Sequence, residues 1–253
     1  MILVLAGTAD GRELAKKAQD AGYPVLVSTA TQYGSLLAKD TPVRCGALDE
    51  TGFLQVFSQH LISLVVDATH PYAVNVSETA MAACRRAGVK YIRFERPRIS
   101  LPDNELLHQA DTFLAAAQLA AQLGRRIFLT VGSNHLGIFA QTINRREKCL
   151  IARVLPTPGV VQKCVELGFK PSEIVAMQGP FGLELNKAML KHYAADVVVT
   201  KESGEQGGAA AKLQAALELN IPVVLVTRPQ LNYPLTVTDW AGLERNLQAF
   251  DEK

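Results

Sequence analysis

Short hydrophobic runs without alternation recur along the chain, and each is followed by a segment of helical periodicity. The first run, Ile2 to Ala6, stops at Gly7-Thr8, and a helix is predicted over residues 12–21, ending at Gly22. Runs of this kind, apolar on both faces and alternating with amphipathic helices, are typical of a parallel sheet covered by helices. In the first half of the chain the pattern further predicts strands at 25–28, 64–67 and 91–94 and a helix at 74–87.

The alternation is interrupted between Glu95 and Asp111. This stretch contains Pro97 and Pro102 and no sustained helix or strand period, which predicts a connection between domains. We therefore expect two α/β domains, residues 1–98 and 99–253. In the second domain the pattern predicts helices at 112–123, 158–167, 183–193 and 208–219 and strands at 127–130, 150–154, 174–177, 197–200 and 223–227.

Composition narrows the class of protein. Of the 253 residues 48% are hydrophobic and 20% are charged, as in globular domains, and 26 basic against 24 acidic residues leave a net charge of only +2. So small a charge argues against a nucleic-acid partner. The apolar start lacks a basic leader, and no stretch approaches the ~20 apolar residues of a membrane span. We expect a soluble, cytoplasmic protein with no membrane partner, whose four widely spaced cysteines are reduced thiols.

In parallel α/β sheets, ligands bind beyond the carboxyl ends of the strands. Gly7, Thr8 and Asp10 follow the first strand, where a glycine turn and free helix amides suit a phosphate, although Asp10 is equally suited to cap the helix. After the second strand come small hydroxyl residues and no acid, which favours the 2′-phosphate of NADPH over the free ribose of NADH; solvated turn residues are the alternative. These hydroxyl residues are Ser28, Thr29 and Thr31.

Two further segments of the first half end near the same edge. Thr69, His70 and Pro71 follow the strand at 64–67, and Pro71 keeps His70 extended, so we expect contact with cofactor or substrate. Asp67, at the end of that strand, is expected to cap backbone amides of a turn. Arg93 and Arg96 follow the next strand; guanidinium groups suit carboxylates, and a salt bridge to Glu95 or across the domain junction is the alternative.

The second half holds a glycine-rich loop after the strand at 197–200. Glycines permit close approach of the backbone to an anion and Lys201 adds a point charge, although the order of residues is not that of a Walker A loop. Arg153 lies beside another strand end. No H-E-x-x-H, C-x-x-C or G-x-S-x-G motif occurs, so no metal site is expected, and a cofactor with its own reactivity fits best. The candidate residues of the loop are Lys201, Ser203, Gly204, Gly207 and Gly208.

Together these motifs resemble the precorrin-6A reductase family of cobalamin biosynthesis, in its oxygen-dependent (CobK) and cobalt-early (CbiJ) forms. The chain departs from the family pattern at Ala6, where a further glycine is common, and at Glu202, where aspartate is frequent. The matching segments are LAGTADGRELA (5–15), DATHPYA (67–73), YIRFERP (91–97), GPF (179–181) with Asn186, and TKESG through GG to Lys212 (200–212).

The resemblance implies two Rossmann-like domains with mainly parallel sheets facing a shared cleft that holds a pyridine nucleotide. It implies reduction of one ring double bond of precorrin-6A, or of its cobalt complex, with NADPH as cofactor, or NADH in the cobalt-early branch. The carboxylate arms of the macrocycle would bind Arg93, Arg96, Arg153 and Lys201, and His70 and Lys201 are the candidate catalytic residues. A monomer or weak homo-oligomer is expected. The alternative is a non-catalytic two-domain binding or sensor protein for an anionic metabolite.

Overall fold

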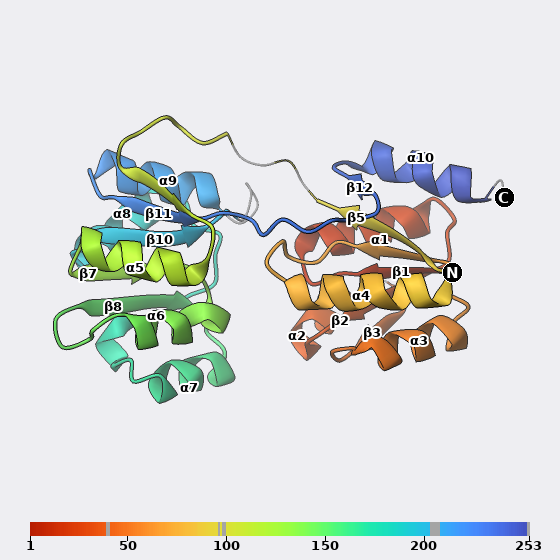
Figure 1. Cartoon of the computed structure of the whole chain (residues 1–253), viewed down its shortest axis with the longest axis horizontal. Helices are drawn as coiled ribbons and strands as arrows, with labels where there is room; N and C mark the ends of the chain where they lie inside the picture. The colour runs from red at the N-terminus through yellow and green to blue at the C-terminus, as the bar shows by residue number, and fades with distance from the viewer. Residues whose placement is uncertain (39–40, 96, 98–99, 203–207, 252–253) are drawn as a thin grey trace. The chain divides into compact units, whose positions relative to one another are not determined.

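The computed structural model describes residues 1–38, 41–95, 97, 100–202 and 208–251. The chain divides into two compact units, each an α/β domain (Figure 1). The first unit comprises residues 1–97 together with 229–253, and the second comprises residues 98–228.

The first unit is built on a six-stranded parallel sheet in the order β12-β5-β4-β1-β2-β3. The chain runs from β1 outward to β2 and β3, then crosses to the other side of β1 with β4, so the order reverses between β1 and β4. This is the Rossmann order, with a sixth strand supplied by the C-terminal segment. The strands are β1 (Ile2–Leu5), β2 (Val25–Thr29), β3 (Val43–Cys45), β4 (Leu64–Asp67), β5 (Lys90–Phe94) and β12 (Thr236–Val237).

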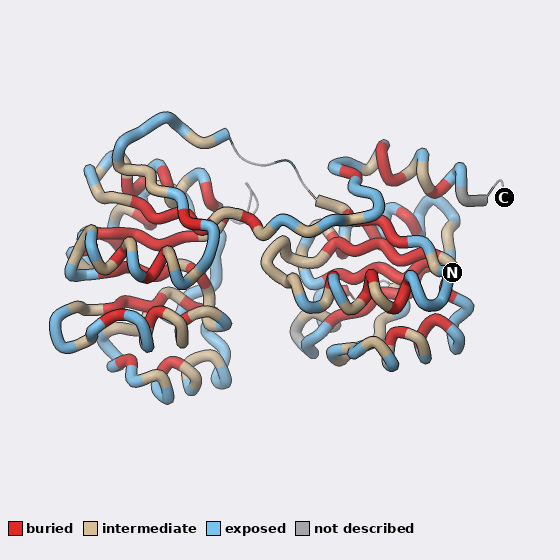
Figure 2. Tube along the Cα trace, viewed as in Figure 1, coloured by how far each residue is buried: buried red, intermediate tan, exposed pale blue. Residues whose placement is uncertain are grey.

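Helices cover both faces of this sheet. On one face α1 and α10 pack through Leu14 and Leu247 against the inward side chains of β1, β2 and β4. On the other face α3 and α4 pack through Phe53 and Met81. The central strands β1, β2 and β4 are therefore buried along their whole length (Figure 2). The helices are α1 (Ala9–Asp20), α2 (Gln32–Leu36), α3 (Glu50–Gln59), α4 (Val74–Ala87) and α10 (Trp240–Asp251).

The second unit repeats this plan with a six-stranded parallel sheet in the order β6-β11-β10-β7-β8-β9. Here β7 takes the place of β1, because the chain runs outward to β8 and β9 and then crosses to β10. The reversal therefore falls between β7 and β10. The strands are β6 (Leu107–Ala110), β7 (Arg126–Leu129), β8 (Cys149–Val154), β9 (Ile174–Ala176), β10 (Val197–Lys201) and β11 (Val223–Val226).

In the second unit α8 and α9 pack on one face through Met189, Leu190 and Leu213. Helices α5 and α6 cover the opposite face, and α7 packs beside β8 and β9 (Figure 1). Within the described residues, no helix combines the length and hydrophobicity that a membrane crossing requires. The helices are α5 (Phe113–Leu123), α6 (Leu136–Thr142), α7 (Pro158–Glu166), α8 (Leu183–His192) and α9 (Ala209–Glu218).

The prediction of an α/β fold with two parallel sheets is confirmed, but two parts of the expected organisation are wrong. Residues 229–253 belong to the first unit and not the second, because β12 pairs with β5 and α10 packs on the first core. The stretch expected to be a connection contains β6, which forms because residues 107–110 pair with β11. Both β6 and β12 lie at sheet edges. Each forms because it pairs with a strand that is distant in the sequence, and not because its own residues show a strand pattern.

Candidate active site

The loops after β1 and β4 meet at the reversal point of the first sheet. Leu5, the last residue of β1, lies beside both Ser28 and Asp67 in the strand register, so three strand ends are level. The Thr8 hydroxyl donates to Ala68 O over 2.9 Å and accepts from Gly11 N over 3.1 Å. Thr8 is therefore the N-cap of α1, the role for which the sequence also suggested Asp10. Its hydrogen bond to Ala68 connects the loop after β1 with the loop after β4.

The start of α1 has the features of an anion-binding turn. A Cβ built on Gly7 would meet nothing within 4 Å, so the space before this turn is open. A Cβ on Gly11 would lie only 2.8 Å from Ala6 Cα, so only glycine lets the helix pack this closely on β1. Because the first-turn amides of a helix have no partner within it, they present donors and a partial positive charge to this space.

An arginine that the sequence analysis did not single out joins the second strand end. Arg44, on β3, donates from Nη1 to Ser28 Oγ over 2.9 Å and to Gly46 O over 2.7 Å. Its Nη2 donates to Cys45 O over 3.1 Å. These bonds hold the positive charge of Arg44 beside the Ser28 hydroxyl at the end of β2. In NADH-binding Rossmann folds, an acidic residue lies at this position. Arg44 was missed because the three-residue strand that carries it was not predicted.

The other two hydroxyl residues of this segment have structural partners. Thr29 is buried, and its hydroxyl lies 2.6 Å from Ser35 Oγ and donates to Thr31 O over 3.2 Å. The Thr31 hydroxyl accepts from Gly34 N and caps the short helix α2. Of the three hydroxyls proposed as cofactor ligands, only that of Ser28 therefore lies against a cation in the described contacts.

Asp67 anchors the loop that follows β4. It is completely buried and accepts from Thr69 N and Thr69 Oγ1 through Oδ1, at 2.9 and 2.7 Å, which confirms the expected capping of a turn. Its Oδ2 accepts from Ser77 and Tyr91, each at 2.5 Å. Burial and the neighbouring carboxylate raise the pKa of Tyr91, so its hydroxyl remains a donor.

Arg93 completes this network and is not placed as expected. Only 1% of its surface is exposed, and its Nη1 donates to Asp67 Oδ1 over 3.0 Å and to Thr69 Oγ1 over 3.1 Å. The Tyr233 ring lies 5.2 Å from its guanidinium carbon. Arg93 is thus enclosed by its own unit, and its salt bridge is made with Asp67, a partner that the sequence analysis did not name. We do not assign it a substrate carboxylate.

His70 projects from the loop that this network holds. Its carbonyl accepts from Ala73 N over 2.8 Å, which closes a turn with Pro71 at the second position. Its Nδ1 accepts from Tyr72 N over 3.3 Å. In the neutral ring this leaves Nε2 to carry the hydrogen, so His70 can donate a hydrogen bond from this loop; donation of a proton requires the imidazolium form of the ring.

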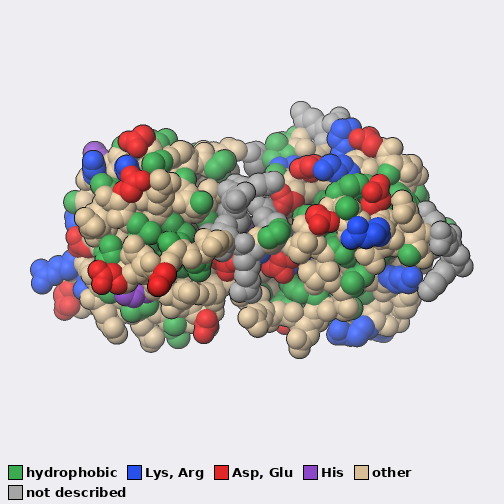
Figure 3. All heavy atoms as spheres, turned by 90° about the horizontal axis from the view of Figure 1, so that it is seen from above, with side chains coloured by type: hydrophobic (Ala, Val, Ile, Leu, Met, Phe, Trp, Pro, Cys, Tyr) green, Lys and Arg blue, Asp and Glu red, His purple; other side chains and the backbone are tan. Residues whose placement is uncertain are grey.

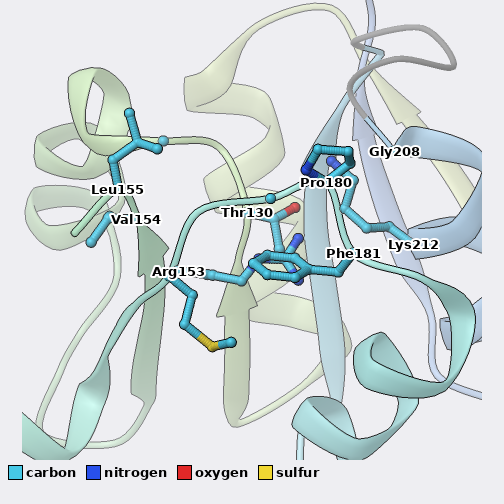
Figure 4. A pocket seen from close by; sticks show the side chains of 11 residues that line it. Thr130, Arg153, Val154, Leu155, Pro180, Phe181, Gly208 and Lys212 are labelled. Carbon is cyan, nitrogen blue, oxygen red and sulfur yellow. The ribbon is translucent and has the colours of Figure 1, made fainter. Parts of the chain in front are cut away.

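In the second unit, Arg153, Gly208 and Lys212 line a cavity of about 290 Å³ at the carboxyl edge of the sheet (Figure 4). Lys201, the last residue of β10, lies close enough to Lys212 for their charges to interact. Gly208 adopts a positive φ of 64° as the N-cap of α9. The other predicted residues of this loop, Ser203, Gly204 and Gly207, lie outside the described residues, as does Arg96.

Burial lowers the pKa values of four basic groups of the second unit. It lowers the pKa of Lys201 to about 8 and that of Arg153 to about 10. The pKa of Lys212 falls to about 7 because of burial and the nearby charges of Arg153 and Lys201. His135, stacked on Phe113 with ring centroids 3.6 Å apart, has its pKa lowered to about 4 by burial and by Lys201 and Lys163.

On the face of the molecule that Figure 3 shows, basic and acidic side chains both occur on each unit, and no large patch of one sign is visible there. The concentrated positive charge of the described residues lies instead at the carboxyl edge of the second sheet. That distribution suits a small anionic ligand better than an extended phosphate backbone.

Two parallel sheets in the Rossmann order, with glycine turns and cations at their carboxyl edges, place this chain among the Rossmann-like α/β proteins, whose ligands bind where the strand order reverses. Residues 1–248 match the family model described as "Precorrin-6x reductase CbiJ/CobK". The chain belongs to this family. The resemblance seen in the sequence is thereby confirmed, and membership in a family of reductases decides against a non-catalytic sensor protein.

Several curated relatives align along nearly the whole chain. The cobalt-precorrin-6A reductase of Salmonella typhimurium is 39% identical over 231 residues, covering 90% of this chain and 87% of the relative. That of Methanothermobacter thermautotrophicus is 38% identical, covering 91% and 77%. The precorrin-6A reductase of Rhodobacter capsulatus is 34% identical, covering 90% and 88%. A solved structure, "CobK precorrin-6A reductase", superposes with a TM-score of 0.81 at 28% identity, covering 98% of this chain and 96% of the other.

Proposed function

We propose that this chain reduces a ring double bond of precorrin-6A or cobalt-precorrin-6A with a hydride from NADPH. Family membership carries the reaction class, because the similar proteins are named as reductases of these two macrocycles. The preference for NADPH is our own step. The observation that supports it is the Arg44 guanidinium bonded to Ser28 at the end of β2.

The residues at the first sheet fit a dinucleotide. The amides that open α1 after Gly7 would hold the pyrophosphate, and the close packing at Gly11 keeps the helix end against the sheet. Ser28 and Arg44 would hold the 2′-phosphate, since a guanidinium donates charge-assisted hydrogen bonds to such a group. The bound reduced nicotinamide supplies the hydride.

The macrocycle is a polycarboxylate, so its recognition requires cations. Arg153 and Lys201 remain the proposed substrate ligands in the second unit, where burial keeps competing water away from them. The shared cleft between the two domains stays a prediction, as do a cytoplasmic location and a monomeric or weakly associated state.

In this account, the chain acts chiefly by positioning. Holding two reacting carbons in a near-attack geometry contributes up to about 7–11 kcal/mol without a covalent intermediate. The carbon next to the one that receives the hydride takes up a proton, either from His70 Nε2 or from water. The Asp67 network fixes the loop of His70 and therefore the place from which that proton is donated.

The test is a matrix of turnover assays. Oxidation of NADPH and of NADH is followed with precorrin-6A and with its cobalt complex, and each macrocyclic product is identified by mass. The proposal predicts a product two hydrogens heavier than at least one macrocycle and a larger kcat/KM with NADPH. If no pairing of nucleotide and macrocycle produces a dihydro product, the proposed reaction is wrong; if turnover occurs with NADH preferred, only the assignment of the cofactor fails.

A further inference from the structure

The cavity of the second unit contains positive charge that no described acidic residue balances. Figure 4 shows Arg153 entering the space from β8 and Lys212 entering from α9, with the Phe181 ring beside the guanidinium. Within the part of the chain that the structure describes, neither Arg153 nor Lys212 forms an ion pair with a carboxylate. Buried or half-buried cations of proteins are ordinarily paired, so the missing partner is expected to come from a ligand.

Arg153 is held in a fixed orientation. Its guanidinium carbon lies 4.8 Å from the centre of the Phe181 ring and 5.9 Å from that of Phe128. Its Nη1 donates to Asn186 Oδ1 over 2.8 Å. Asn186 is itself buried and oriented, because its Nδ2 donates to the carbonyls of Phe181 and Gly182. Apart from a weak contact of Nη1 with a methionine sulfur, the described contacts of Arg153 leave Nε and Nη2 available as donors.

Lys212 contributes an amine whose protonation depends on whether an anion is bound in the cavity. The charged groups that face it are Arg153 and Lys201, both positive, and with burial they lower its pKa to about 7. A bound anion would reverse that balance and favour the charged amine. The first turn of α9 opens beside the same space at Gly208, and its amides add further donors.

We propose that this cavity binds one oxyanionic group of a ligand between Arg153 and Lys212. This inference rests on the proposed function, which offers two sources for such a group. One is a carboxylate arm of the macrocycle, and the other is a phosphate of the dinucleotide. Both groups accept paired hydrogen bonds from a guanidinium and a point charge from an amine. Lys212 thereby becomes a binding residue in addition to those that the sequence indicated.

The experiment replaces Lys212 by methionine, which keeps the length of the side chain and removes its charge. The matched control is Lys191→Met, at an exposed lysine of α8 in the same unit. In the free protein, burial and the nearby positive charges disfavour the charged form of the Lys212 amine. Lys212→Met is therefore expected to fold at least as stably as the unsubstituted chain, and urea denaturation checks this. Binding is measured without turnover, by fluorescence titration with uroporphyrin, a stable polycarboxylate tetrapyrrole, and separately with NADP⁺.

If the group is a carboxylate arm, Lys212→Met weakens uroporphyrin binding by about tenfold or more, the loss of one charge-assisted bond, and leaves NADP⁺ binding unchanged. If the group is a phosphate, Lys212→Met weakens NADP⁺ binding by a similar factor and leaves uroporphyrin binding unchanged. Lys191→Met changes neither. In a weakly buffered solution above the pKa of Lys212, the unsubstituted chain also takes up protons on binding, and Lys212→Met takes up fewer.

Two results would overturn the inference. One is a Lys212→Met protein that binds both probes as the unsubstituted chain does, and the other is an unsubstituted chain that binds neither probe. These outcomes are separate from the failure of the proposed function. Binding of uroporphyrin through Lys212 without reduction of precorrin-6A would preserve the cavity and reject the reaction. Reduction of precorrin-6A by a chain whose binding of both probes does not depend on Lys212 would preserve the reaction and reject the cavity.

Discussion

The guanidinium of Arg93 donates to Asp67 Oδ1 over 3.0 Å, and both side chains are enclosed, with at most 1% of their surface exposed. The second unit has a comparable pair in a similar place. Glu202 follows β10 and Arg228 follows β11, both 3% exposed, and Arg228 Nε donates to Glu202 O over 3.1 Å. In each unit, a buried acid is thus paired with a buried arginine at the end of the strand next to the reversal point.

Replacing Arg93 by methionine should destabilise the fold strongly. The substitution leaves the Asp67 carboxylate buried without its counter-charge, and breaking a buried pair in this way costs about 3–5 kcal/mol. Urea denaturation followed by circular dichroism measures the change in the free energy of unfolding.

The control is Arg86→Met, which removes the ion pair with Glu50 at 3.2 Å, where the arginine side chain is 68% exposed. Surface pairs contribute about 0–1 kcal/mol, so this variant should change little. Equal losses in the two variants would show that the Asp67 network does not depend on its charge pair.

Arg44→Ala should raise the KM for NADPH and leave kcat/KM with NADH almost unchanged. Hydrogen bonds to charged groups contribute about 1.5–3 kcal/mol, so the loss of the guanidinium corresponds to a rise of about ten- to hundredfold. Steady-state kinetics with the two nucleotides measures the ratio. Ser28→Asp, which places an acid where NADH-binding folds carry one, should shift the preference in the same direction.

A matched control for Arg44 is Arg12→Ala, at a half-exposed residue of α1 that is not among the described contacts of Ser28. It should leave the ratio of kcat/KM for the two nucleotides as it is. Equal loss of NADPH and NADH activity in Arg44→Ala would mean that Arg44 supports the β2 loop and does not contact the 2′-phosphate.

His70→Asn should lower kcat by about tenfold or less and leave both KM values near those of the unsubstituted enzyme. A positioned general acid contributes about 10²–10⁴-fold, but water can deliver the same proton, which limits the loss. The asparagine side chain can still accept from Tyr72 N, so the loop is expected to keep its turn. A kcat that does not change would remove His70 from the reaction.

The stability of the protein should fall as the pH is lowered from about 6.5 towards about 4, in part because of His135. Its folded-state pKa is lowered from 6.5 to about 4, so within this window the unfolded chain binds the additional proton and the folded protein does not. Unfolding is therefore favoured as the pH falls. Measured across the window, His135→Gln should lose stability less steeply, whereas His60→Gln, at an exposed histidine of the first unit, should behave as the unsubstituted chain. Identical slopes in all three proteins would contradict the assignment.

Strands with a continuous apolar sequence were predictable, as was a helix with clear signals at its ends. The helix at 74–87 was predicted with its observed bounds, because Pro71 precedes it and Gly88 ends it with a φ of 69°. The edge strands were not predictable in this way. β6 and β12 are short and partly polar, and each exists because it pairs with a strand more than one hundred residues away in the sequence.

The candidate site, like the fold, was predictable only in part. The loops after β1, β4 and β10 were identified because the carboxyl ends of parallel strands mark the binding edge. The partners of individual side chains were not, since nothing local places Arg44 beside Ser28 or Arg93 beside Asp67. Lys212 was noticed only as part of a motif, and its role depends on Arg153, which lies on another element.

Hydride transfer from a nicotinamide to the macrocycle can be followed directly with an isotope label. NADPH carrying deuterium at C4 of the nicotinamide, on one face and then on the other, is turned over with precorrin-6A and its cobalt complex, and the product is examined by mass spectrometry. If hydride transfer occurs, the reduced macrocycle carries one deuterium from one of the two labelled nucleotides and none from the other. A reduced macrocycle without deuterium from either label would contradict hydride transfer.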